Sequence, residues 1–133
     1  MLLTAPPPRE RAAPSQVHEV IKRDRALLPE ERLKVCVLAA CPFPANHGTP
    51  GSIREMSEAV ADLGHEVHIV TYHIGEPIPL RGPILHRIPR LTGESAVVVG
   101  PTIRRPLYDL QMVLTTLAVI RDHRPQLIHA HGY

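Results

Sequence analysis

One stretch of the chain, residues 33–64, constrains the fold more than any other. It opens with a nearly unbroken apolar run, residues 33–41, which is typical of a strand buried on both faces of a sheet. A loop follows over residues 42–52, and apolar residues then recur at helical spacing from Ile53 until Gly64. A strand, a glycine-bearing loop and a helix in this order indicate an α/β fold that presents backbone N–H groups to a phosphate.

Three further apolar runs are predicted to be strands, in residues 65–73, 84–89 and 126–133. The short run 96–99 is either another strand or a buried loop. Right-handed crossovers between the strands give a doubly wound, mostly parallel Rossmann-like sheet with strand order 3-2-1-4. Ligands of such sheets bind at the carboxyl ends of the strands where the winding reverses, here between the first and the fourth strand.

A second helix is predicted to begin near Pro101, with Thr102 as its cap. It should end at His123 or Arg124, because Pro125 cannot continue a helix. Its apolar residues recur at the three- and four-residue spacing of an amphipathic helix: Leu107, Leu110, Val113, Leu114, Leu117, Ala118 and Ile120. Since no helix follows the fourth strand to cover its second face, we expect the chain to belong to a longer protein and to associate or aggregate alone.

The first candidate for chemistry is the glycine-bearing segment 48–52. Gly51 directly before a helix would let an anion approach the N–H groups of the first turn, where the helix dipole is positive. Gly48 belongs to the same loop, and Ser52 would cap the helix or donate to the ligand. A plain turn explains such a glycine equally well, so the loop by itself leaves both interpretations open.

The same loop argues against two nucleotide-binding motifs. It lacks the G-x-G-x-x-G spacing, and its length of about ten residues does not suit the tight turn of the dinucleotide fingerprint. The second strand ends at Thr71 to His73 without an acidic residue for ribose hydroxyls. A G-K-[ST] sequence is also missing. A nicotinamide-dependent enzyme is therefore disfavoured.

The second candidate is the pair His129 and His131. Strand alternation places both rings on one face. We predict no metal site, because no third ligand follows at a recognisable spacing. His129 is expected to be a hydrogen-bonded core residue, whereas His131, at the carboxyl end, is suited to donate to an anion or a substrate hydroxyl. Four further histidines are expected at the surface or at strand ends, without a role: His65, His68, His73 and His86. His47 lies in the loop after the first strand, where it is expected to be exposed to solvent, with a position facing the crevice as the alternative.

Composition limits the partners and the cellular location that we expect for the protein. A net charge of +2 is too small to indicate a nucleic-acid partner. Positive charge gathers after residue 80, and Arg104 and Arg105 could touch lipid phosphate, although such residues are usually solvated. Cys36 and Cys41 lie too far apart in one strand to be bridged. Reduced thiols and the lack of a secretory or membrane-spanning segment favour a cytoplasmic protein and leave open a peripheral contact with the inner face of the membrane. Residues 1–32 form a Pro- and Arg-rich, partly disordered extension.

Several segments together resemble the N-terminal domain of family-4 glycosyltransferases. They are residues 33–44, 48–56, 64–71 and 127–132, and the resemblance covers residues 33–133. These enzymes are retaining, use nucleotide-sugars and have the GT-B fold of two Rossmann-like domains. The resemblance implies a partial, acceptor-side GT-B domain over residues 33–133, whose substrates are a nucleotide-sugar and a lipid-linked or glycan acceptor.

The resemblance also implies roles for individual residues. Gly51 and Ser52 match the family's loop toward the donor, although many members have adjacent glycines where this chain has Thr49 and Pro50. His131 matches the histidine that approaches the transferred sugar. No counterpart of the C-terminal nucleotide-binding domain and its E-x7-E motif is present in the sequence, so transfer by this chain alone is not expected. The alternative is a non-catalytic Rossmann-like binding module.

Overall fold

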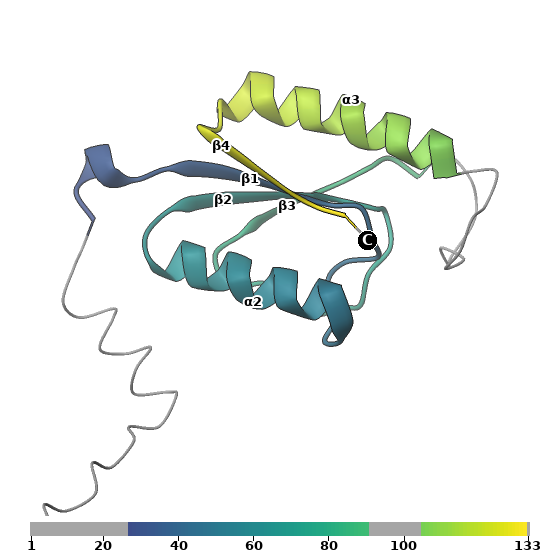
Figure 1. The fold of residues 1–133 in the computed structure, drawn as a ribbon, viewed down its shortest axis with the longest axis horizontal. Coiled ribbons are helices and arrows are strands. Elements are labelled where there is room, and N and C mark those ends of the chain that lie inside the picture. Colours follow the sequence, from purple (N-terminus) through teal and green to yellow (C-terminus); the bar gives the residue numbers. More distant parts are fainter. Residues whose placement is uncertain (1–26, 91–104, 133) are drawn as a thin grey trace, which may run out of the picture.

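The computed structural model describes residues 27–90 and 105–132, which form a four-stranded sheet with one helix on each face (Figure 1). The strands are β1 (Lys34–Ala39), β2 (Glu66–Thr71), β3 (Ile84–Arg87) and β4 (Leu127–His131). The helices are α2 (Gly48–Asp62) and α3 (Arg105–His123), and a short 3-10 turn, η1 (Pro29–Glu31), precedes β1. The chain is therefore an α/β protein of the predicted class.

All three strand pairings are parallel, and the strand order is β3-β2-β1-β4. The predicted 3-2-1-4 order is confirmed. The register pairs Ala39, the last residue of β1, with Thr71 of β2 and His131 of β4. The strands β1, β2 and β4 thus end side by side, at the edge where the winding of the sheet reverses.

Helix α2 covers one face of the sheet and closes the larger apolar core. Ile53 is fully buried, and Met56 and Val60 pack beside it at helical spacing against Val37 and Ile69 of the strands. The helix ends where the Leu63 N–H donates to the Ala59 carbonyl. Gly64 follows with a φ of +101°, a conformation that favours glycine, so the chain turns at once into β2.

Helix α3 covers the other face of the sheet. The side of the helix that packs on the sheet is not the side on which the sequence predicted the buried apolar residues. Tyr108, Met112 and Val119 contact the sheet, next to Cys36 and Ile88. Five residues of the predicted apolar pattern are 40–58% exposed: Leu107, Leu110, Val113, Leu114 and Leu117. Because α3 has apolar residues on most of its circumference, periodicity alone did not reveal which side packs on the sheet.

Other boundaries differ slightly from the expected ones. Helix α2 begins at Gly48 rather than near Ile53, so the loop after β1 covers residues 40–47 and is shorter than predicted. Helix α3 ends at His123 as expected, whereas its predicted start and the run 96–99 lie outside the described residues, as do residues 1–26. Strand β4 is exposed over most of its length. Neither helix in the described part of the chain has the length and apolar character needed to cross a bilayer.

Candidate functional site

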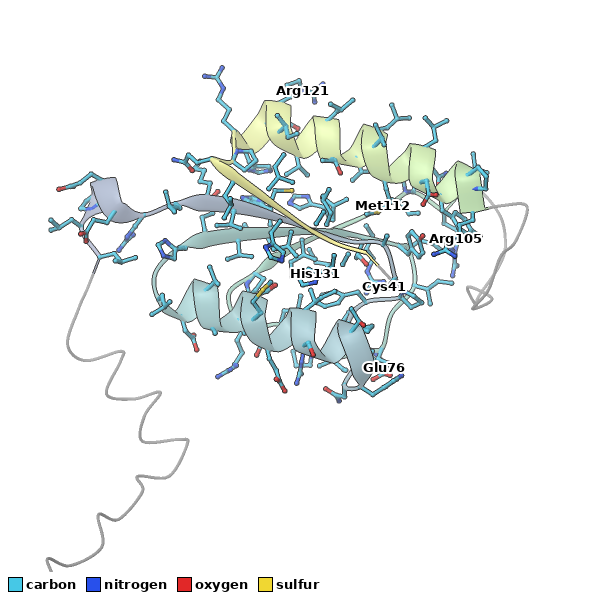
Figure 2. The ribbon with its side chains drawn as sticks, in the orientation of Figure 1. Cys41, Glu76, Arg105, Met112, Arg121 and His131 are labelled. Atoms are coloured by element: carbon cyan, nitrogen blue, oxygen red, sulfur yellow. The ribbon has the colours of Figure 1, made fainter. Side chains whose placement is uncertain are left out.

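The candidate site lies at the carboxyl edge of the sheet, where the loop of residues 40–47 leaves β1. The Thr71 hydroxyl donates to the Cys41 carbonyl at 2.9 Å, and this buried bond ties the start of the loop to the end of β2. Cys41 and Glu76 lie at the end of the molecule where β4 also finishes (Figure 2). Neither Cys36 nor Cys41 forms a disulfide in the described structure, as predicted.

A second loop, residues 72–83, holds the first one in place. The Phe43 N–H donates to the Ile74 carbonyl at 2.9 Å, and the Glu76 N–H donates to the Pro44 carbonyl at 2.8 Å. Between these two bonds the backbones touch at Gly75, where an added Cβ would overlap the Phe43 carbonyl. Only glycine fits there. Gly75 thus supports the site, although nothing in the sequence singled it out.

Gly48 and Gly51, the two glycines of the predicted phosphate site, lie within the first turn of α2 rather than in a loop before the helix. Gly48 has a φ of +58° and starts the helix after His47, which is the N-cap. The Gly51 N–H already donates to the His47 carbonyl at 3.3 Å, and a Cβ on Gly51 would lie 3.1 Å from the Asn46 carbonyl carbon. Gly51 therefore lets the helix approach the loop closely, and its N–H is not available to a phosphate.

The helix start nevertheless retains donors for an anion. The N–H groups of Gly48 and Thr49 have no intrahelical acceptor, because the first residues of any helix lack one, and Pro50 has no N–H. Ser52 is exposed, and its hydroxyl donates to the Gly48 carbonyl at 3.5 Å rather than capping the helix. The anion-binding capacity of this turn thus lies with Gly48, Thr49 and the Ser52 hydroxyl.

His131 stands beside Ala39 on the α2 side of the sheet, in the position that the sequence predicted. Its ring lies 4.5 Å from the ring of His129, and its buried Nε2 has no hydrogen-bond partner in the described structure. Burial lowers the pKa of His131, and the neighbouring His129 lowers it further. The ring is therefore neutral near pH 7 and able to exchange one hydrogen bond with a ligand.

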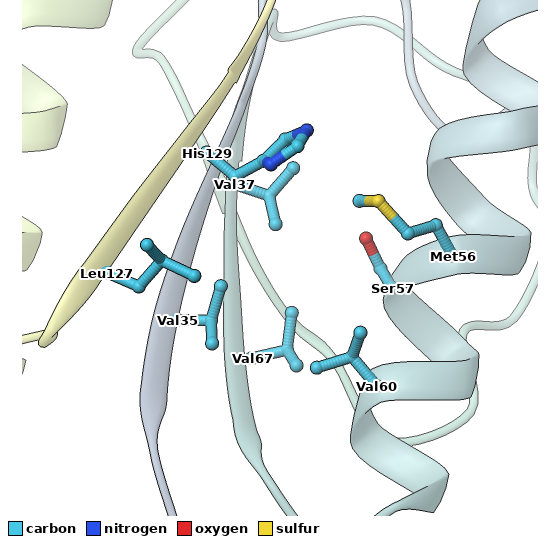
Figure 3. Close-up of a pocket in the computed structure, with 8 residues that line it drawn as sticks. All are labelled: Val35, Val37, Met56, Ser57, Val60, Val67, Leu127 and His129. Carbon is cyan, nitrogen blue, oxygen red and sulfur yellow. The ribbon is translucent and has the colours of Figure 1, made fainter.

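His129 departs from its prediction. It is exposed on the edge strand and is not a hydrogen-bonded core residue. Its ring faces a small cavity between α2 and the sheet, with a volume of about 100 Å³ (Figure 3). The lining is almost entirely apolar: Val35, Val37, Met56, Ser57, Val60, Val67, Leu127 and His129. The cavity is not lined by Gly48, Gly51, Ser52 or His131, and it is far smaller than the ~300–1,000 Å³ of usual ligand pockets.

Two polar residues near the carboxyl edge were missed. Gln111 of α3 is 4% exposed, and neither its amide nitrogen nor its oxygen has a partner among the described residues. His73 follows β2 closely, and both of its ring nitrogens are also buried without a hydrogen-bond partner among the described residues. The centroid of its ring lies 5.5 Å from that of the Tyr108 ring. A buried polar group without a partner is uncommon and marks a place for a ligand or water. Gln111 was missed because the wrong side of α3 was taken as buried.

Some of the residues predicted to lie at the surface are exposed in the structure, and one is buried. His47 is exposed, as expected, and its Nδ1 lies 3.7 Å from Glu76 Oε1. Arg105 is exposed at the start of α3, near the same edge of the molecule (Figure 2), whereas Arg104 lies outside the described residues. His68 is fully buried in β2, which corrects the prediction of a surface or strand-end position. The contacts in the described structure join His131 to His129, and none joins it to Gly48, Gly51 or Ser52.

A sequence profile of a known family, described as Glycosyltransferase Family 4, matches residues 47–133 of the chain. The matched segment begins at the N-cap of α2 and includes β2, β3, α3 and β4. No curated protein matches the chain.

Proposed function

Because the chain belongs to glycosyltransferase family 4, we propose that residues 33–133 form the acceptor-side domain of a retaining, GT-B-type enzyme. It transfers a sugar from a nucleotide-sugar to a glycan or lipid-linked acceptor. The observation that supports this most strongly is the pairing of His131 with Ala39, directly before the loop to α2. The pairing puts a neutral histidine and a helix N-terminus at one edge of the sheet, which is where parallel α/β folds bind ligands.

In this proposal His131 positions the transferred sugar. Its Nε2 has no hydrogen-bond partner in the described structure, so a sugar hydroxyl can pair with the ring. The residue is not required as a base, because in a retaining reaction of this family type the leaving phosphate accepts the proton of the incoming hydroxyl. A neutral ring serves this purpose, since it can donate or accept according to its tautomer.

The first turn of α2 contacts the donor phosphate. The N–H groups of Gly48 and Thr49 and the positive end of the helix dipole favour an anion there. The Ser52 hydroxyl is exposed and only weakly engaged, at 3.5 Å from the Gly48 carbonyl, so it can turn toward a phosphate oxygen. Gly51 contributes indirectly, by letting the helix approach Asn46.

In this proposal the nucleotide-sugar donor is bound by a second domain as well as by this one. The cavity of about 100 Å³ beneath α2 is too small to enclose a nucleotide-sugar, and its lining is apolar. We therefore place the nucleotide on a separate nucleotide-binding domain, outside these 133 residues. The chain by itself should bind a donor weakly and should not transfer sugar.

The first experiment titrates the chain with UDP-, GDP- and ADP-hexoses and follows amide chemical shifts. One of these donors should perturb Gly48, Thr49 and Ser52, and His131→Ala should abolish the response. His65→Ala is the matched control, because His65 lies at the amino end of β2 and accepts a hydrogen bond from the Leu33 N–H. Equal responses of the His131→Ala variant and the wild type would point instead to a non-catalytic binding module.

The second experiment measures transfer. In a chain that also carries the nucleotide-binding domain, His131→Ala should lower kcat/KM by about 100-fold or more, the usual effect of removing one preorganised hydrogen-bond partner. The 133-residue chain should give no turnover with any donor. Measurable transfer by this chain would contradict the two-domain part of the proposal.

Peripheral membrane contact is part of the same proposal and is supported by α3. The helix exposes an apolar stripe that includes Leu110, Leu114 and Leu117, and Arg105 lies at its start. An apolar helix face flanked by cations is suited to the interface of an anionic membrane on the cytoplasmic side. The chain should co-sediment with anionic vesicles and lose this binding in Leu114→Asp, whereas binding unchanged by that substitution would count against the contact.

A further inference from the structure

Three histidines that are far apart in the sequence meet on the α3 side of the sheet, the face opposite His131. His68 belongs to β2, His86 to β3, and His123 is the last residue of α3. One ring nitrogen from each residue can be chosen so that all three lie within 4.8 Å of one another. His68 is fully buried, and the other two are half-buried. The cluster has no part in the sugar-transfer proposal.

The rings are in direct contact. The centroid of the His68 ring lies 4.1 Å from that of His123 and 5.1 Å from that of His86, and the latter two rings are 5.4 Å apart. His68 Nδ1 is 2.9 Å from His86 Nε2. Two imidazole nitrogens at this distance either share one proton or turn both lone pairs toward a common cation.

A carboxylate fixes the orientation of the buried ring. Glu66 Oε1 lies 2.8 Å from His68 Nε2 and accepts its N–H. With the proton of His68 on Nε2, the Nδ1 lone pair faces His86. An imidazole that donates to a carboxylate through one nitrogen and offers the other is the usual arrangement of a metal-binding histidine, because the carboxylate sets the tautomer and raises the basicity of the ligand. Glu66 also lies 3.6 Å from Lys34 Nζ, which holds it at the strand start.

We propose that His68, His86 and His123 bind one divalent transition-metal ion, for which Zn²⁺ is the best match, with Glu66 as the residue that positions His68. Imidazole nitrogens suit zinc, copper and nickel rather than calcium or magnesium, which prefer oxygen ligands. Three protein ligands leave a fourth tetrahedral position for water or an exogenous ligand.

The geometry needs only a small adjustment. Bonds of about 2.0 Å at tetrahedral angles place ligand nitrogens about 3.3 Å apart. His68 Nδ1 and His86 Nε2 are 2.9 Å apart, and one nitrogen from each of the three rings can be chosen so that none is more than 4.8 Å from another. Rotation of the half-buried rings of His86 and His123 can close the difference without movement of the strands.

The position of the site suggests what the ion does. It would join the C-terminal end of α3 to β2 and β3, on a helix whose buried residues Tyr108 and Met112 each remain 7% exposed. A ligand that binds the folded state and not the unfolded chain raises the melting temperature in proportion to the logarithm of its concentration. The ion thus stabilises the placement of α3 and takes no part in sugar transfer.

The test uses metal-stripped protein and added ZnCl₂. Calorimetry should show one ion bound per chain, the melting temperature should rise with Zn²⁺, and Co²⁺ should give the visible absorption of a tetrahedral site. His86→Ala and His123→Ala should each weaken Zn²⁺ affinity by more than about 100-fold, and Glu66→Gln by about 10-fold, the lower end for loss of an orienting carboxylate. His68→Ala is less useful, because removing a fully buried ring can unfold the chain.

The double variant His129→Ala/His131→Ala is the matched control, since it removes a histidine pair from the other face and should leave Zn²⁺ affinity unchanged. Circular dichroism of His86→Ala and His123→Ala checks that both fold. The proposal is overturned if Zn²⁺ does not bind the wild type, if the two folded variants bind it as tightly as the wild type, or if the control variant loses the binding instead.

Discussion

The two faces of the sheet are covered by helices that pack in different ways. On the α2 side, Ile53 of the helix and Phe43 of the neighbouring loop are fully buried. On the α3 side, the helix's own buried residues are between 3 and 7% exposed and include Gln111, whose amide has no partner among the described residues. Helix α2 is therefore packed more closely at its centre than α3. Buried polar atoms without a partner among the described residues occur on both sides, as Ser57 Oγ and His131 Nε2 on the α2 side and as the Gln111 amide on the α3 side.

The largest predicted effect compares the two helices directly. Ile53→Ala should lower the free energy of unfolding by about 4 kcal/mol, because it leaves a cavity in a closely packed apolar core. Leu114→Ala, on the exposed stripe of α3, should change it by less than about 0.5 kcal/mol. Urea unfolding of both variants measures the difference. Similar losses would mean that the α3 stripe is covered in solution.

The next effect tests the loops on the α2 side. Gly75→Ala should cost about 3 kcal/mol of unfolding free energy, the upper end for overpacking, because the new Cβ meets the Phe43 carbonyl. Gly132→Ala is the matched control, since a Cβ there meets nothing within 4 Å. Thermal melts of the two variants should separate clearly. An unaffected Gly75→Ala melt would show that the two loops are not held together in solution.

The smallest effect concerns the protonation of His131. Burial, followed by the charge of His129, lowers its pKa in the folded chain below the ordinary 6.5. The unfolded chain therefore binds a proton more readily than the folded chain. The contribution of His131 to stability is complete above about pH 6.5 and declines as the pH falls toward the lowered pKa.

An NMR titration of the ring protons measures this effect. The midpoint of His131 should lie below 6.5 in the wild type and rise part of the way toward that value in His129→Ala, because burial is the larger cause and persists. A wild-type midpoint above 6.5 would contradict the burial of this ring. An unchanged midpoint in His129→Ala would show that His129 does not lower the pKa of His131.

The sequence predicted the α/β class, the strand order and the position of His131, and the structure confirms them. The physical reason is that these features rest on local signals. The first strand is apolar over nearly its whole length, the glycines and prolines stop each element, and right-handed crossovers leave few topologies open. The family resemblance was likewise confirmed by the match over residues 47–133.

The site was only partly predictable. Gly51 was expected to precede the helix and to let an anion approach the first turn. It lies inside that turn instead, because α2 begins at Gly48, and its N–H donates to the His47 carbonyl. Helix starts are poorly defined by sequence when a proline and two glycines all occur within four residues. Gly75 could not be recognised either, because its importance comes from contact with the backbone of Phe43, which belongs to another loop.

What the sequence alone determined is the order of the elements and, to within about two residues, where each strand ends. The tertiary structure decided which side of α3 is buried, because that helix is apolar on most of its circumference and only packing selects Tyr108 and Met112 over Leu110 and Leu114. It also brought His68, His86 and His123 together, since contact between two strands and a helix end depends on sheet register and helix length. No local pattern contains that information.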